Sequence, residues 1–110
     1  MQVSVLTYRE HTVITVEGDI NIYNVRTLKE AIEGLMDGSV QSVIVDMKGV
    51  NAVDSTGLAA LYVGKRKMEA LKGTFALANV GKSIADLLRI AQMDFRIIEF
   101  NLGPLADEEE

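Results

Sequence analysis

The sequence contains no cysteine, no tryptophan, one histidine and one proline in 110 residues. Without cysteine the chain forms neither disulfides nor thiolate metal sites, and His11 alone cannot build a multi-histidine metal site. Acidic residues outnumber basic ones by 16 to 11, which gives a net charge of −5. Nucleic-acid binding relies on basic patches that neutralise phosphates, so we expect no direct contact with nucleic acid. The missing cysteines and the single histidine lead us to expect no metal either.

Long hydrophobic runs are also missing. No apolar stretch approaches the ~20 residues that a membrane-spanning helix needs. The opening residues, MQVSVLTYRE, lack the basic start and long apolar segment of a signal peptide. These absences predict a cytoplasmic protein with no membrane contact.

The composition is that of one globular domain. Hydrophobic residues make up 48% of the chain and charged residues 25%, and no segment repeats. We expect residues 1–102 to form a single domain. The final stretch, ADEEE, is a block of like charge, so residues 103–110 are predicted to be a disordered acidic tail.

Hydrophobic patterning predicts an α/β fold. Residues 3–8 and 12–17 are rich in β-branched residues and read as antiparallel strands joined by a turn at residues 9–11. Apolar residues with helical spacing follow, with Asn24 as a candidate N-cap and Asp37-Gly38 as the end. The remaining expected elements are strands at 42–47, 74–79 and 96–100 and helices at 56–71 and 83–91.

This order, a hairpin followed by alternating helices and strands, predicts a mixed, mostly parallel sheet with helices packed on it. The run SVIVDM, residues 42–47, has almost no polar alternation. Such a strand is covered by helices on both faces, or by helices on one face and tight packing on the other. It is the candidate central strand.

The stretch NAVDSTGLAALY, residues 51–62, places three polar side chains between this strand and the next helix. Asp54 or Ser55 is suited to be the N-cap of that helix. The position beyond the carboxyl end of a central strand is also where open α/β sheets hold their ligands. Gly57 would leave the first helical turn bare, so that another molecule could approach the Ser55 hydroxyl.

Three catalytic interpretations fail at this corner. The nucleophile elbow G-x-S-x-G needs glycine where Val53 stands, and the single histidine lies in the predicted hairpin. The GKS stretch at residues 81–83 lacks the first glycine of a phosphate-binding loop, because that position is Ala76. Acid–base chemistry would need Asp19, Asp46 or Asp54 to converge in a pocket, and no spacing demonstrates this. We therefore expect a protein that is not an enzyme.

Several segments together resemble the anti-sigma-factor antagonist family, which consists of small STAS domains. VDSTGLAALY resembles the family's D-S-[ST]-G-L signature, and VEGDINIYNVRTLKEAI resembles its G-[ED]-[IL]-D segment at the second strand and first helix. VQSVIVDMKGVNAVDSTGL is similar to its third strand and phosphorylation site. The resemblance covers nearly the whole chain and has the same order of elements.

The resemblance implies a binding module in a partner switch. The unphosphorylated protein would bind an anti-sigma factor that is itself a serine kinase, and would thereby free a sigma factor. The kinase would inactivate it by phosphorylating Ser55, and a metal-dependent serine phosphatase would reverse this. ATP and metal would belong to these partners, so this chain would need no cofactor.

The partner surface implied by the resemblance surrounds Ser55. Instead of contacting a partner, Tyr23 could pack against the protein and Asn24 could cap the first helix. Thr56 is a second possible phosphate acceptor, but we expect its hydroxyl to bond to the helix start. Asn21 stands where the family usually has aspartate, which favours the alternative of an unphosphorylated scaffold or modulatory component of a larger signalling assembly. The candidate contact residues are Asp19, Asn21, Tyr23, Asn24, Asp54, Ser55, Thr56 and Gly57.

Overall fold

An antiparallel hairpin begins the chain in the computed structural model, which describes residues 1–99. Strands β1 (Gln2–Tyr8) and β2 (His11–Glu17) pair in continuous register from Gln2 opposite Glu17 to Tyr8 opposite His11. Only Arg9 and Glu10 lie between them, and Arg9 has a φ of 57°. The predicted turn at residues 9–11 is therefore one residue shorter, because His11 already pairs with Tyr8.

The remaining elements alternate as predicted. They are α1 (Val25–Glu33), β3 (Ser42–Gly49), α2 (Ser55–Ala70), β4 (Thr74–Ala78), α3 (Lys82–Ile90) and β5 (Arg96–Ile98). The strands described form one sheet in the order β1-β2-β3-β4-β5, parallel from β2 onward, with β3 at its centre. Residue 100 of the expected last strand and the predicted tail at 103–110 lie outside the described residues.

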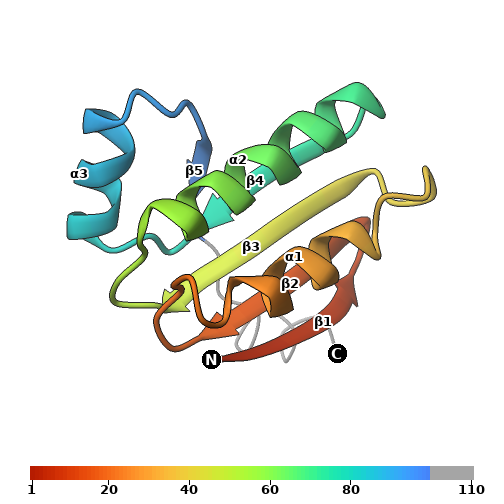
Figure 1. The fold of residues 1–110 in the computed structure, drawn as a ribbon. Coiled ribbons are helices and arrows are strands. Elements are labelled where there is room, and N and C mark those ends of the chain that lie inside the picture. The colour runs from red at the N-terminus through yellow and green to blue at the C-terminus, as the bar shows by residue number, and fades with distance from the viewer. Residues whose placement is uncertain (100–110) are drawn as a thin grey trace.

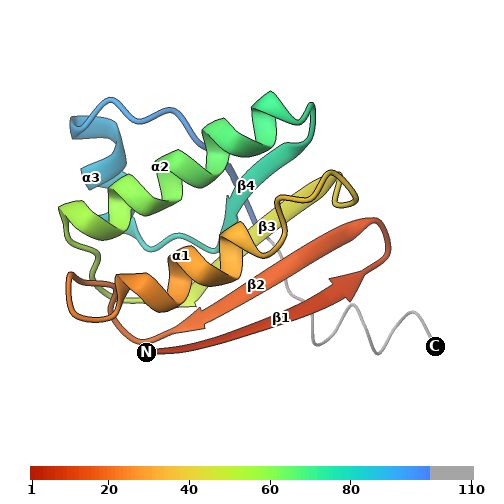
Figure 2. The ribbon, with the colours of Figure 1, turned by 45° about the vertical axis from the view of Figure 1, so that its right-hand side comes forward.

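Helices α1 and α2 lie side by side on one face of the sheet, and α3 packs against the same core near one end (Figures 1 and 2). This core contains inward side chains of the three central strands and of each helix, among them Ile14, Val45, Leu77, Leu28, Leu61 and Ile84. The opposite face carries a smaller buried cluster of Val13, Ile44 and Ala78. In the described part of the chain, β3 thus has helices on one face, and on the other face its Ile44 is buried in the smaller cluster.

Helix α1 ends earlier than its sequence predicts. It runs only to Glu33, with Gly34 at the C-cap, although the apolar spacing continues to Leu35 and Met36. These two residues lie in a turn and still pack against the main core while partly exposed. The helical spacing of the apolar residues therefore predicted correctly which residues pack on the core, but it did not predict where the helix ends.

Candidate partner-binding surface

Two loops meet at the carboxyl ends of β2 and β3. The first is residues 18–24 and the second residues 50–54. Ile20 donates its backbone N–H to the carbonyl of Ala52, and Asp54 donates to the carbonyl of Ile20, both at 3.0 Å. Ile20 also forms a parallel bridge with Val53. The fold thus joins both segments that the family resemblance selected.

Asp54 holds this corner together. One carboxylate oxygen accepts hydrogen bonds from the backbone N–H groups of Thr56 at 3.0 Å and Gly57 at 3.1 Å, and from the Thr56 hydroxyl. The other accepts from the Ile22 N–H at 3.0 Å. The Thr56 hydroxyl, together with these backbone donors, lowers the pKa of the Asp54 carboxyl below its usual value. The carboxylate therefore stays charged at the N-terminus of α2, where negative charge is favoured.

Asp54 and not Ser55 is the N-cap of α2. Ser55 is the first residue of the helix, and its side chain is exposed. Within residues 1–99 its hydroxyl makes no hydrogen bond. The Thr56 hydroxyl is engaged with Asp54, as expected for a side chain that serves the helix start. Of these two hydroxyls, the one on Ser55 is available to another molecule.

The polar side chains of residues 19–24 shape their own loop. Asn24 accepts from the Asn21 N–H and donates to the carbonyl of Asp19, both at 2.9 Å. It occupies the N-cap position of α1, as predicted, but its side chain makes no bond to the first turn of the helix. Asn21 accepts from the Tyr23 N–H at 2.9 Å. The loop is thus held by asparagine side chains on one side and by Asp54 on the other.

The 18–24 loop exposes two apolar side chains beside the start of α2. Tyr23 is 94% exposed, so the packing role considered for it is wrong. Ile22 is 63% exposed and was missed in the sequence. The available signal was its place beside Tyr23, as a pair of apolar residues between Asn21 and Asn24 in a segment predicted to be a loop. Large exposed apolar side chains next to polar groups are typical of protein contact surfaces.

Gly57 has a different role from the one expected. It is buried, and a Cβ at this position would lie 2.6 Å from Val53 Cγ1 and 2.7 Å from Ile20 Cγ2. Its missing side chain lets the first turn of α2 pack onto the two loops. The expectation that Gly57 opens the helix to an approaching molecule is therefore wrong, because its bare face points inward.

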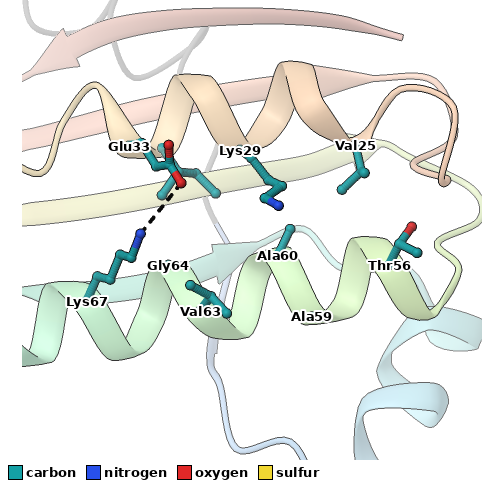
Figure 3. A pocket seen from close by; sticks show the side chains of 10 residues that line it. Val25, Lys29, Glu33, Thr56, Ala59, Ala60, Val63, Gly64 and Lys67 are labelled. Carbon is teal, nitrogen blue, oxygen red and sulfur yellow. Dashed lines mark ion pairs between the residues drawn. The ribbon is translucent and has the colours of Figure 1, made fainter.

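A groove between α1 and α2 begins at this corner and was not expected from the sequence. It has a volume of about 540 Å³, and Figure 3 shows Val25 and Thr56 at one end. At the other end Lys67 Nζ lies 3.5 Å from a Glu33 carboxylate oxygen. Val63, which lines it, is 49% exposed. Val25, which lines the groove, is the residue that directly follows the 18–24 loop, so loop and groove adjoin at this end.

Two of the aspartates considered for acid–base chemistry are engaged in hydrogen bonds. Asp46 accepts from the Lys48 N–H and from Asn79 Nδ2, both at 3.0 Å, while Asp54 is occupied by the helix start. No group of three or more histidine, aspartate or glutamate side chains able to hold a metal ion occurs within residues 1–99. Across the same residues, every helix is too short or too polar to span a membrane.

The fold and this corner define a small α/β domain with a serine exposed at a helix start. The STAS domain model matches residues 2–109, and the chain belongs to that family. This confirms the resemblance and the fold class expected from the sequence.

Solved structures of similar proteins share the fold. An anti-sigma-factor antagonist from Mycobacterium paratuberculosis is 20% identical, with a TM-score of 0.81 over 99% of this chain and 94% of that one. SpoIIAA of Bacillus in its phosphorylated form is 18% identical, with a TM-score of 0.77 over 99% and 100%. A serine-to-glutamate variant of Moorella thermoacetica RsbS is 18% identical, with a TM-score of 0.76 over 99% and 96%.

Proposed function

We propose that this chain is a non-enzymatic anti-sigma-factor antagonist. Its unphosphorylated form binds an anti-sigma factor with serine kinase activity and frees a sigma factor. Phosphorylation of Ser55 ends the binding, and a metal-dependent serine phosphatase restores it. The observation that carries the proposal is the exposed Ser55 hydroxyl at the start of α2, beside the exposed Ile22 and Tyr23 side chains.

The contact surface of this proposal consists of Ser55, Ile22, Tyr23 and the mouth of the α1–α2 groove. Asp19, Asn21, Asn24, Asp54 and Thr56 contribute by holding the loops in place, since their side chains or carbonyls bond to one another and to the helix start. Gly57 is not part of this contact surface because it is buried.

The chemistry of the site supports release of a partner on phosphorylation. A phosphate on Ser55 adds about −1.5 to −2 charges directly beside the ionised Asp54 carboxylate. Asp54 already accepts the N–H groups of Thr56 and Gly57, so the phosphate finds two of the helix-start donors occupied. The added charge would be desolvated under a bound partner, and every ~1.4 kcal/mol lost weakens binding tenfold.

Asn21 bears on the alternative of an unphosphorylated scaffold or modulatory component of a larger assembly. Its side chain accepts the Tyr23 N–H, and an aspartate at this position could accept the same bond. The loop shape therefore does not depend on the amide. Compared with the aspartate usual in the family, Asn21 lacks a negative charge near the start of α2. This difference would change the electrostatic interaction with a kinase.

Phosphosite mapping tests the proposal. The protein is mixed with ATP, magnesium and the serine kinases of its host that resemble histidine kinases, and intact and peptide masses are measured. We expect one phosphate, on Ser55, with loss of kinase binding. Ser55→Ala should abolish it while changing the free energy of unfolding by no more than about 0.5 kcal/mol, because Ser55 is not the cap.

Ser83→Ala is the matched control. Ser83 is also an exposed serine in the first turn of a helix, α3, but lies outside the two joined loops. Its removal should leave phosphorylation unchanged. Phosphate on Ser83 or Thr56, or phosphorylation that leaves kinase affinity intact, would contradict the proposed switch. A stable kinase complex without any phosphate would favour the scaffold alternative.

A further inference from the structure

The two edges of the sheet are built differently (Figures 1 and 2). At one edge β5 has three residues, includes Arg96 and is flanked by the exposed Asp94 and Glu99. At the other, β1 has seven residues, QVSVLTY, without a charge or a proline, and its pairing with β2 has no bulge. Proteins normally protect sheet edges by short strands, charges, prolines or bulges. The β5 edge is protected, whereas β1 has none of these devices.

Within residues 1–99, the outer side of β1 has no backbone hydrogen-bond partner. Tyr8 and His11 flank a two-residue loop, and such a pair exchanges both its backbone hydrogen bonds. Because the pattern alternates, Val3, Val5 and Thr7 direct their N–H and C=O groups away from β2. No strand within residues 1–99 pairs with this side.

We propose that β1 binds β1 of a second copy of this chain, antiparallel, about a twofold axis at Val5. A twofold axis perpendicular to the sheet places Val5 opposite its own copy and Val3 opposite Thr7. Every outward N–H and C=O of these residues then has a partner. The two sheets become one continuous sheet, and Val5, which is 47% exposed, is covered by its counterpart.

Side chains on the face opposite the helices fit this register. A hollow of about 460 Å³ on β1 and β2 is lined by Gln2, Ser4, Thr15 and Glu17, with Val3 at its side. Leu6 of the second copy would stand opposite Ser4, and Tyr8 of the second copy opposite Gln2. Leu6 is 36% exposed, so its side chain can enter the rim of the hollow.

Charge selects a second copy as the occupant. The strand is uncharged from Gln2 to Tyr8, so no like charges meet at the centre despite the net charge of −5. At the strand end the Arg9 guanidinium lies over the Tyr8 ring, 5.5 Å from its centre. Glu17 pairs with Gln2, the residue that Tyr8 of the other copy would face. In this register Arg9 of one copy faces Met1 of the other and β1 separates it from Glu17, so the charges at both ends stay outside the strand contact.

Engineered cysteines test the register, since the chain has none of its own. In Val5→Cys the two Cα atoms would be about 5.5 Å apart, within the range that a disulfide spans. In Leu6→Cys, two residues out of register, they would be roughly 8 Å apart and beyond that range. Under mild oxidation we expect Val5→Cys to form covalent dimers and Leu6→Cys to remain largely monomeric. Equal or faster cross-linking of Leu6→Cys would overturn the proposal.

Sedimentation of the full chain tests association without cysteines. An interface of one strand pair is small, so we expect a dissociation constant of roughly 1 μM to 1 mM. Leu6→Lys should weaken it at least tenfold, and Ile97→Lys at the β5 edge, where Ile97 is 48% exposed, should not. Circular dichroism checks that both variants fold. A wild-type chain that stays monomeric to about 1 mM, or equal effects of both variants, would overturn the proposal.

Discussion

At the scale of single residues, Asp54 and Gly57 decide how the phosphosite is presented. Asp54 binds two N–H groups of the helix start and, across 32 positions, the N–H of Ile22. Gly57 lets α2 pack directly on Ile20 and Val53. Ser55 is left between them with its hydroxyl exposed. The Ser55 hydroxyl is therefore available because Asp54 caps the helix and Gly57 packs against the loops.

Gly57→Ala should destabilise the protein. The new methyl group would approach Val53 and Ile20 within 2.7 Å, and overpacking of this kind costs about 1–3 kcal/mol. Thermal or urea unfolding measures the loss. Gly34→Ala is the control, because Gly34 has a φ of −62° and its nearest neighbour at this position is 3.4 Å away. Unchanged stability of Gly57→Ala would refute the packing role.

At the scale of elements, the loop of residues 18–24 and the α1–α2 pair form one surface. Loop and helix start are joined through Asp54, and the groove continues from Thr56 toward Lys67. Gly64 allows this close pairing of helices, since a Cβ there would lie 3.0 Å from Ile32. The element that carries Ser55 therefore also forms one wall of the groove.

Tyr23→Ala should weaken kinase binding without affecting stability. The side chain is 94% exposed, so its removal costs the folded protein little, whereas a buried aromatic anchor at an interface is worth at least ~1.4 kcal/mol, or tenfold in affinity. Titration calorimetry with the kinase, beside thermal unfolding, separates the two effects. Leu87→Ala is the control, as an exposed apolar residue on α3. Equal affinity of Tyr23→Ala and the wild type would exclude Tyr23 from the interface.

At the scale of the whole molecule, stability should depend on pH through the helix start. The lowered pKa of Asp54 means that the folded state holds the carboxylate more strongly than the unfolded state, whose pKa is about 3.9. This contribution is complete above that value and is lost as the pH falls through the lowered folded pKa. Asp37, whose pKa is lowered by Ser39, acts in the same direction.

The expected result is a melting temperature that falls below about pH 4. Asp54→Asn can keep the cap but removes the charge, so its melting temperature should be lower at neutral pH and should fall less between pH 5 and pH 2. Asp94→Asn, at an exposed aspartate that caps no helix, should follow the wild type. Parallel pH profiles for Asp54→Asn and the wild type would exclude Asp54 as a source of the slope.

The sequence by itself determined the order of strands and helices, the central place of β3 and the position of Ser55 at a helix start. These follow from local properties, namely hydrophobic spacing, turn residues and a short polar motif. Only the tertiary structure decided that Asp54 is the cap, that Asn24 bonds within its loop, that Gly57 faces inward and that Ile22 is exposed. The cap bonds of Asp54 and the loop bonds of Asn24 join near neighbours, between which the sequence pattern left alternatives open. The Asp54–Ile22 bond and the inward face of Gly57 depend on the approach of residues 18–24 to residues 50–57, which no local pattern encodes.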